Sequence, residues 1–314
     1  MLSSACSQET NLEGFRDDEI ANMLTLNSVV TPDSAISVVA TKPYFFSDVH
    51  NGYDFVDDLS IEVWINDIHK GAMSYDYQNN RYRIDETPSA GDRIMISTIY
   101  NGKKVSASDV VPHQAVIEEV RVERKGPMHI FGNRDYMMTY YVTFTDNADE
   151  ENYYFFAYDQ YGSSIETNMG QKDYSHEFVF QQLARTINAT VPGWAPSSEM
   201  GLPFSDVGIN GETHTLTVKE VIQNSGFDYV TKWKSLPRFF KLYSISKPYY
   251  SYLVSLLCNG NGKDNIQSGM IDFGLVEPLK IYGNINGGLG VLGCYSHHIQ
   301  VIDVIDLLGS FPEK

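Results

Sequence analysis

A glycine-rich stretch late in the chain has the spacing of a nucleotide-binding motif. Gly288, Gly290 and Gly293 spell G-x-G-x-x-G, a pattern that cradles a pyrophosphate when it follows a strand and opens a helix. The run that follows, Ile299–Ile302, is mostly β-branched, and no crossover helix fits after it. We therefore expect no cofactor here. We interpret five residues as a structural glycine corner, where the backbone turns tightly or another segment approaches closely: Gly283, Gly287, Gly288, Gly290 and Gly293.

Eight histidines could act as general bases or metal ligands, but their spacing matches no catalytic motif. Neither H-E-x-x-H nor G-x-S-x-G occurs, which counts against a zinc-protease helix and against an α/β-hydrolase nucleophile. His297 and His298 are the one adjacent pair in the sequence. Because neighbouring side chains of an extended segment point to opposite faces, we expect surface or core histidines here, and no metal site.

Acidic residues offer a second source of chemistry. Four of them fall within Asp146–Glu151, but their spacing does not fit a D-x-[DN]-x-[DN]-G calcium loop. We interpret this segment as the solvated tip of a hairpin. A carboxylate pair at the separation used by glycosidases depends on the fold and not on sequence spacing. The 40 Asp and Glu residues therefore leave a hydrolase open as an alternative.

Three cysteines, Cys6, Cys258 and Cys294, form neither a C-x-x-C pair nor a disulfide framework. Cys258 and Cys294 either pair with each other or act as small buried apolar residues. The residues before Cys6, Leu2-Ser3-Ser4-Ala5, look like the end of a bacterial lipoprotein signal, which would make Cys6 a lipidation site; the alternative is an ordinary frayed N-terminus. No run reaches the roughly 18 apolar residues of a membrane span, so membrane attachment is expected only through a lipid anchor.

Charge and composition restrict the partners. The chain has 23 Lys and Arg against 40 Asp and Glu, a formal net charge of −17, which repels nucleic acids and anionic lipids. Hydrophobic residues make up 42%, enough for a core. Aromatic residues make up 13%, and most of the 21 tyrosines are expected to fill sheet faces. The loop aromatics Tyr44, Phe45, Tyr53 and Trp194 are candidate ligand contacts.

These groups must be positioned by a chain that carries β signals from Met23 onward. Alternating segments between turn residues predict strands, the clearest being Arg93–Tyr100 and Lys103–Asp109 around a type I′ turn at Asn101-Gly102. We expect residues 1–21 to form a leader or tether and residues 22–125 a β-sandwich. Lys125-Gly126-Pro127 is the predicted domain boundary.

Residues 126–314 are expected to form a larger antiparallel β domain with helical insertions. Four apolar residues alternate along its first strand: Met138, Tyr140, Val142 and Phe144. Helical spacing predicts a helix at Tyr174–Asn188 and another after Ser246, which can cap it, with Pro248 in the first turn and Asn259-Gly260 at the end. The predicted fold class is all-β with about two helices.

A series of short motifs resembles a known family. The motifs are Cys6 before an acidic leader, Asn101-Gly102-Lys103, Asn152-Tyr153-Tyr154, Phe204-Ser205-Asp206 with Gly211, Tyr249–Leu253, and Asn284–Gly290, the most specific of them. Together they span nearly the whole chain and resemble the surface lipoproteins of unknown function that are widespread in Bacteroidetes, a numbered family of domains of unknown function. Two features depart from the family: the signal sequence before Cys6 is missing, and the Tyr174–Asn188 insert is longer than expected.

The resemblance implies an all-β protein of two domains that begins with an immunoglobulin- or transthyretin-like sandwich. It also implies a cell-surface address at the outer membrane, often alongside TonB-dependent transporters. It implies no reaction and no catalytic residues.

Our first hypothesis from the sequence is a non-catalytic, lipid-anchored surface protein that captures a nutrient glycan or peptide, or assists a TonB-dependent transporter. A hydrolase that uses a carboxylate pair and a structural spacer are the alternatives. An exposed aromatic row would favour a glycan, an open strand edge a peptide, and a deep cleft with two facing carboxylates the hydrolase.

Overall fold

The computed structural model describes residues 18–43, 52–130, 133–160, 170–186, 195–196, 201–222, 237–260 and 280–303. These residues are mostly in β-strands with few helices, which confirms the predicted all-β fold class. In chain order the elements are α1 (Asp18–Ala21), β1 (Thr25–Val30), β2 (Ser37–Thr41), β3 (Glu62–Ile65), β4 (Ile68–Ala72), β5 (Ser74–Asp76), β6 (Arg81–Arg83), β7 (Arg93–Tyr100), β8 (Lys103–Val110), β9 (Ile117–His129), β10 (Asn133–Thr145), β11 (Tyr153–Gln160), β12 (Gly170–Asp173), α2 (Phe178–Thr186), β13 (Ala195–Pro196), β14 (Leu202–Ser205), β15 (Thr213–Ile222), β16 (Arg238–Ile245), α4 (Lys247–Gly260) and β17 (Leu289–Ile302).

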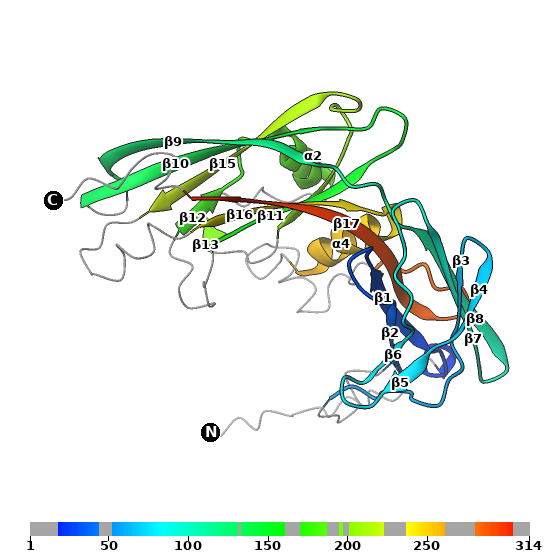
Figure 1. Ribbon diagram of the computed structural model, residues 1–314. Helices are drawn as coiled ribbons and strands as arrows, with labels where there is room; N and C mark the ends of the chain where they lie inside the picture. The colour runs from blue at the N-terminus through cyan, green and yellow to red at the C-terminus, as the bar shows by residue number, and fades with distance from the viewer. Residues whose placement is uncertain are drawn as a thin grey trace, which may run out of the picture.

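The described strands form three sheets that pack as two β-sandwiches (Figure 1). One sheet has eight strands in the order β14-β11-β16-β17-β1-β2-β6-β5. Its β1-β2-β6-β5 end packs against the four-stranded sheet β4-β3-β7-β8, and we call this pair the N-terminal sandwich. Its β14-β11-β16-β17 end packs against the five-stranded sheet β13-β12-β15-β10-β9, and we call this pair the C-terminal sandwich.

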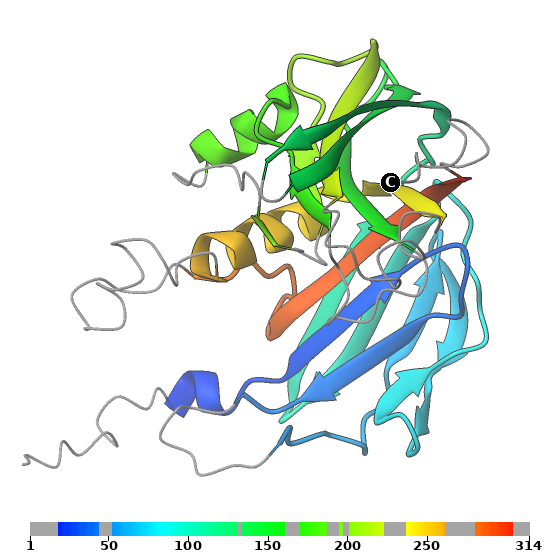
Figure 2. The ribbon, with the colours of Figure 1, turned by 90° about the vertical axis from the view of Figure 1, so that its left-hand side faces the viewer.

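Strand β17 belongs to both sandwiches. Its first half pairs in parallel with β1, from Thr25↔Leu289 to Val30↔Cys294. Its second half, from Tyr295 to Ile302, pairs with β16 in the antiparallel sense. In Figure 2 the strand runs diagonally from the N-terminal sandwich into the C-terminal one. The predicted second domain, residues 126–314, therefore includes a strand that also completes the N-terminal sandwich.

Alternating apolar residues build both cores, because every second side chain of a strand faces the opposite sheet. Ile61, Val63 and Ile65 are all buried in the N-terminal sandwich. In β10, the four alternating residues of the predicted strand are fully buried in the C-terminal sandwich: Met138, Tyr140, Val142 and Phe144. The face predicted for this strand is confirmed.

Two hairpin turns contain residues that adopt positive φ angles readily. Asn101 and Gly102 have φ of 48° and 75°, as the predicted type I′ turn between β7 and β8 requires. Asn66 and Asp67, with φ of 52° and 65°, make a similar turn between β3 and β4. Strand β4 was not predicted, because its residues, Ile68–Ala72, do not alternate between apolar and polar.

Two helices lie close to their predicted positions. Helix α4 begins after Ser246, whose Oγ accepts the backbone N–H of Tyr249 at 3.4 Å, so the predicted cap is present. Helix α2 begins at Phe178, later than the predicted Tyr174, because the Asp173 carboxylate accepts the Ser175 N–H at 2.8 Å and holds the chain in a turn first. The predicted end of that helix, Asn188, lies outside the described residues.

The predicted domain boundary, Lys125–Pro127, lies within β9. This part of β9 pairs with β10 across a shift in register. At Gly126 an added Cβ would lie 2.7 Å from the carbonyl oxygen of Asp135. The Gly-Pro pair therefore marks an irregularity of a paired strand. The predicted tether, residues 1–21, includes the short helix α1 at its end. In the part of the chain that the structure describes, no helix combines the length and the apolar character needed to cross a membrane.

The glycines of the predicted corner lie at the start of β17 and within it. Gly290 has φ of +101°, and a Cβ there would lie 2.1 Å from the carbonyl oxygen of Leu26 on β1. At Gly293 a Cβ would lie 2.8 Å from the Cβ of Tyr249 on α4. At Gly283, Gly287 and Gly288 an added Cβ would lie between 2.4 and 2.6 Å from a backbone oxygen. The G-x-G-x-x-G residues thus open a strand, and neighbouring segments pack directly on their backbone.

Candidate binding surface

The eight-stranded sheet has one face turned towards the two cores and one turned away from them. On the C-terminal sandwich, Phe156, Phe240 and Leu242 point into the core. Because side chains alternate, their neighbours Phe155 and Tyr243 lie on the outward face. Both are only partly buried. The outward face of β11, β16 and β17 therefore carries large aromatic side chains that the core does not use.

Four aromatic side chains on this face form a continuous set, which we call the aromatic row: Phe155, Tyr243, Tyr295 and His297. Phe155 lies directly opposite Tyr243, and Tyr243 lies directly opposite His297, so the row crosses three strands. Ring centroids are 5.7 Å apart for Phe155–Tyr243, 5.5 Å for Tyr243–Tyr295 and 5.5 Å for Tyr243–His297. Such cross-strand ring contacts fix the side chains in place, and partial exposure leaves them able to contact a ligand.

Charged groups border the aromatic row. The Lys241 ammonium lies 2.6 Å from the Asp159 carboxylate, and the two side chains are 26% and 30% exposed. Burial alone would lower the pKa of Lys241, but the hydrogen bond and the charge of Asp159 outweigh it and raise that pKa. For Tyr243, in contrast, burial raises the pKa, because it disfavours the charged phenolate. The surface thus combines apolar rings with fixed hydrogen-bonding groups, the mixture that binding sites for polar organic ligands use.

The other end of the row touches the N-terminal sandwich. His297 Nδ1 lies 3.2 Å from the carboxylate of Asp33, in the turn between β1 and β2. The His297 side chain is 24% exposed and that of Asp33 is 58% exposed. His298 faces the other way, and its Nδ1 accepts the backbone N–H of Ile117 at 3.1 Å. The adjacent histidines therefore serve different partners. Across the described residues, no group of three or more His, Cys, Asp or Glu side chains is placed to hold a metal ion.

The loop residues proposed as ligand contacts lie elsewhere. Tyr53 is 71% exposed in the N-terminal sandwich, and its ring contacts Phe55 at 5.9 Å. Tyr44, Phe45 and Trp194 lie outside the described residues, as does Cys6. The aromatic row was not predicted, because the candidate ligand contacts chosen from the sequence were aromatic residues of loops. The adjacent large apolar residues Phe155-Phe156 and Leu242-Tyr243 could have indicated strands with apolar side chains on both faces.

Three groups of buried acidic residues could each be a source of catalysis. In the first, the Glu220 carboxylate accepts hydrogen bonds from Tyr140 Oη at 2.7 Å and Tyr158 Oη at 2.6 Å. Arg238 Nε lies 3.6 Å from the same carboxylate, and Glu220 and Arg238 are both 0% exposed. Burial and the charge of Glu220 raise the pKa of Tyr158. A charge cluster sealed in the core offers no surface to a substrate.

The second group corrects an expectation from the sequence. The predicted solvated hairpin tip is confirmed for residues 147–151, which are exposed, but Asp146 is 4% exposed. Its carboxylate accepts Tyr154 Oη at 2.6 Å and the Gly211 N–H at 2.7 Å. Asp206 is 5% exposed and accepts the Asn152 N–H at 2.7 Å. Burial, with a further contribution from the charge of Asp146, raises the pKa of Asp206. Both carboxylates therefore accept hydrogen bonds that join separate loops, which is a structural role.

The third group lies where β8, the start of α4 and β17 meet. The Asp109 carboxylate accepts a hydrogen bond from the Ser246 hydroxyl at 2.5 Å and another from the backbone N–H of Val110 at 2.9 Å. Ser246 Oγ accepts the N–H of Cys294 at 3.1 Å. All three residues of this group are buried, and burial raises the pKa of Cys294. Cys258 and Cys294 are both free thiols, so the alternative of a disulfide between them is wrong.

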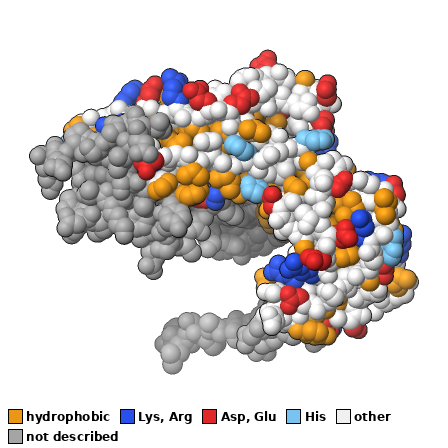
Figure 3. Space-filling model, in the orientation of Figure 1, with side chains coloured by type: hydrophobic (Ala, Val, Ile, Leu, Met, Phe, Trp, Pro, Cys, Tyr) orange, Lys and Arg blue, Asp and Glu red, His pale blue; other side chains and the backbone are white. Residues whose placement is uncertain are grey.

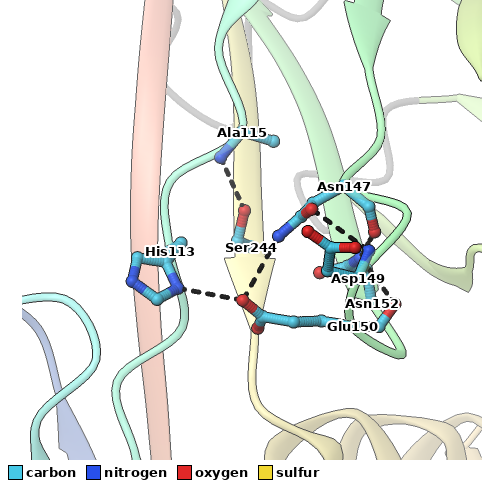
Figure 4. A network of polar contacts seen from close by, with 7 residues as sticks. All are labelled: His113, Ala115, Asn147, Asp149, Glu150, Asn152 and Ser244. Carbon is cyan, nitrogen blue, oxygen red and sulfur yellow. Dashed lines mark hydrogen bonds and ion pairs between the residues drawn. The ribbon is translucent and has the colours of Figure 1, made fainter. Parts of the chain in front are cut away.

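The connection between the two sandwiches runs beside β16 (Figure 4). In this segment, the N–H of Ala115 donates to Ser244 Oγ at 2.9 Å. His113 Nδ1 lies 3.2 Å from Glu150, which also accepts the Asn147 side-chain amide at 3.2 Å. His113 is 63% exposed and Glu150 is 47% exposed, so this pair adds little stability. The Ala115–Ser244 hydrogen bond thus joins this connection to β16.

A family model described as "Domain of unknown function (DUF4249)" matches residues 14–300. The chain belongs to this family. No curated protein matches this DUF4249 chain at a significant level.

Among the solved structures with remote likeness to this chain are the following two. One is described as a "Putative membrane anchored protein" from Corynebacterium diphtheriae, with 10% identity and a TM-score of 0.22; the match covers 72% of this chain and 55% of that one. The other is a glycosyl hydrolase family 2 (GH2) member from Bacteroides cellulosilyticus DSM 14838, with 10% identity and a TM-score of 0.19; it covers 68% of this chain and 23% of that one. With TM-scores this low, neither structure informs the function of the DUF4249 chain.

Proposed function

We propose that this protein is a non-catalytic binding protein of the cell surface that captures a glycan on the aromatic row. The observation that carries the proposal is the contact of Phe155, Tyr243 and His297 across three strands on a partly exposed sheet face. Sugar rings present apolar C–H faces and polar edges. Aromatic rings bind the faces, and nearby charged groups such as Lys241 and Asp159 bind the hydroxyls.

A glycan fits this surface better than a peptide. Capture of a peptide by strand addition needs a free edge with a run of backbone donors and acceptors. The strand at this edge of the sheet, β14, is four residues long and contains Pro203, which has no N–H to donate. The aromatic row, in contrast, points away from the sheet and is independent of its edge.

The cellular address is part of the same proposal. We infer a lipoprotein of Bacteroidetes type, anchored by lipidation of Cys6 in the outer membrane and assisting a TonB-dependent transporter in nutrient capture. Support comes from the position of Cys6 after small residues and before an acidic leader. The net charge of −17 keeps the body of the protein away from anionic lipids, which agrees with an attachment by lipid alone.

Binding is tested by calorimetry with a panel of neutral oligosaccharides and the variant Tyr243→Ala. Removal of one central aromatic contact is expected to lower affinity at least tenfold. Tyr53→Ala is the matched control, since Tyr53 is an exposed tyrosine away from the row. It should bind as the wild type does. No binding by the wild type, or a loss confined to Tyr53→Ala, would refute the proposal, and turnover of a bound glycan would favour the hydrolase alternative.

The address is tested separately. Cys6→Ala should abolish fatty-acid labelling of the protein expressed behind a bacterial lipoprotein signal, and should move it from the membrane fraction to the soluble fraction. A Cys258→Ala variant should leave both readouts unchanged. Labelling that persists in Cys6→Ala would remove the lipid anchor from the proposal, and the glycan-binding part would stand or fall on its own experiment.

A further inference from the structure

A groove on the N-terminal sandwich lies next to the aromatic row. It has a volume of about 650 Å³ and runs between the β1–β2 turn and the β5–β6 hairpin. This volume is in the range of ligand-binding pockets, about 300–1,000 Å³. The side chains that line it are polar, among them Asp33, Ser34, Asp76, Arg81, Arg83 and Asp85.

The groove and the aromatic row lie on the same face of the eight-stranded sheet. In β6, Tyr82 is buried in the core while Arg81 and Arg83 point outward into the groove. In β17, Leu292 and Cys294 face the core of the N-terminal sandwich, so Tyr295 and His297 lie on the outward side. Figure 3 shows Lys, Arg, Asp and Glu side chains gathered on the N-terminal sandwich.

Asp33 joins the two surfaces. It lines the groove, and its carboxylate lies 3.2 Å from His297 at the end of the aromatic row. Four strand spacings separate Tyr243 on β16 from Arg83 on β6, which is roughly 20 Å at about 4.8 Å per strand. A single sugar cannot reach from one to the other, whereas an extended chain of several sugars can.

The chemistry of the groove selects for a neutral ligand. Asp76 is occupied by its own turn, where it accepts the Gln78 N–H at 2.9 Å and the Asn79 side-chain amide at 2.7 Å. Arg83 lies 3.4 Å from Asp85, with 57% and 95% of the side chains exposed. Arginine and aspartate side chains both line the groove, so a bound cation would lie near an arginine and a bound anion near an aspartate. Vicinal hydroxyls can pair with both kinds of group.

We propose that the groove is a second subsite for the same glycan, and that the ligand is an extended neutral oligosaccharide that runs from the aromatic row to Arg81 and Arg83. This inference rests on the proposed function. It adds that affinity depends on chain length, because only longer ligands reach the groove.

The experiment compares trisaccharides with hexasaccharides of the neutral cello-, xylo-, manno- and malto- series by calorimetry. For a series that binds, the wild-type affinity is expected to rise about tenfold from the trisaccharide to the hexasaccharide. The double variant Arg81→Ala/Arg83→Ala should bind the trisaccharide as the wild type does and lose the rise. Arg93→Ala is the matched control, because Arg93 is a half-exposed arginine paired with Asp67 on the other sheet of the same sandwich.

The outcomes separate the two proposals. If Tyr243→Ala loses affinity but the double variant keeps the full length dependence, the groove inference is wrong and the proposed function stands. An affinity that does not rise with length in the wild type also overturns the inference, as does an equal loss for short and long ligands in the double variant. If neither ligand binds the wild type, the proposed function itself fails. Thermal unfolding of each variant checks that the fold is intact.

Discussion

Replacement of Asp109 by Asn is expected to stabilise the protein at neutral pH. Asp109 is 8% exposed at the meeting point of β8, α4 and β17. Burial raises its pKa from 3.8 to about 6, although hydrogen bonds from Ser246 and Val110 act in the opposite direction. Because the folded state binds this proton more tightly than the unfolded state, the stabilisation is fully present below about pH 4 and is lost as pH rises through 6.

The size of the effect follows from the two pKa values. A change from 3.8 to about 6 corresponds to about 3 kcal/mol, at about 1.4 kcal/mol per pH unit. About half of this free energy, roughly 1.4 kcal/mol, should be gained by the wild type when the pH is lowered from 8 to 5. The Asn side chain removes the buried charge but loses one accepted hydrogen bond, at a cost of about 1 kcal/mol. At pH 8 the variant should therefore be about 1–2 kcal/mol more stable than the wild type, and at pH 5 nearly equal to it.

Urea unfolding of both proteins at pH 5 and pH 8 measures this difference, and the other titrating groups cancel in the comparison. Ser246→Ala is the control. It removes the helix cap and the hydrogen bond to Asp109 but keeps the carboxylate. It should lose about 1 kcal/mol at pH 5 and more at pH 8, because loss of the Ser246 hydrogen bond raises the pKa of Asp109 further. If the wild type and Asp109→Asn change equally in stability between the two pH values, the reasoning about the buried carboxylate is wrong.

Two further predictions concern the scaffold. Gly290→Ala places a Cβ 2.1 Å from the Leu26 carbonyl oxygen and should destabilise the protein by more than about 3 kcal/mol. The control Gly71→Ala, at φ of +116° with no atom within 4 Å, should cost about 1–2 kcal/mol. Similar thermal midpoints for the two variants would argue against the close approach of β1 and β17. Glu220→Gln should cost about 3–5 kcal/mol in denaturant unfolding, since it leaves the charge of Arg238 in the core, and a loss below about 1 kcal/mol would contradict the buried ion pair.

Elements with local signals could be predicted from the sequence. The turn at Asn101-Gly102 needs two positive φ angles that this residue pair adopts readily, and both are observed. Ser246 was identified as a cap because its own backbone neighbours supply the donors. The buried face of β10 followed from alternation alone.

Features that depend on distant partners could not be predicted in this way. The acids around Asp146 suggested a solvated turn, but Asp146 is buried by contacts with Tyr154 and Gly211, the second 65 residues away. The aromatic row depends on which strand lies beside which. Phe155, Tyr243 and His297 come from three separate strands, and their register is visible only in the assembled sheet. Ligand binding by the loop aromatics Tyr44, Phe45, Tyr53 and Trp194 stays a prediction.

The division of β17 between two sandwiches has a consequence for the order of events during synthesis. Asn27 on β1 and Val291 on β17 are in contact although 264 positions separate them. While a ribosome is still making the chain, β1 has an unpaired edge and the N-terminal sandwich lacks Leu292 and Cys294 from its core. The N-terminal sandwich can therefore complete its core only after nearly the whole chain has been made.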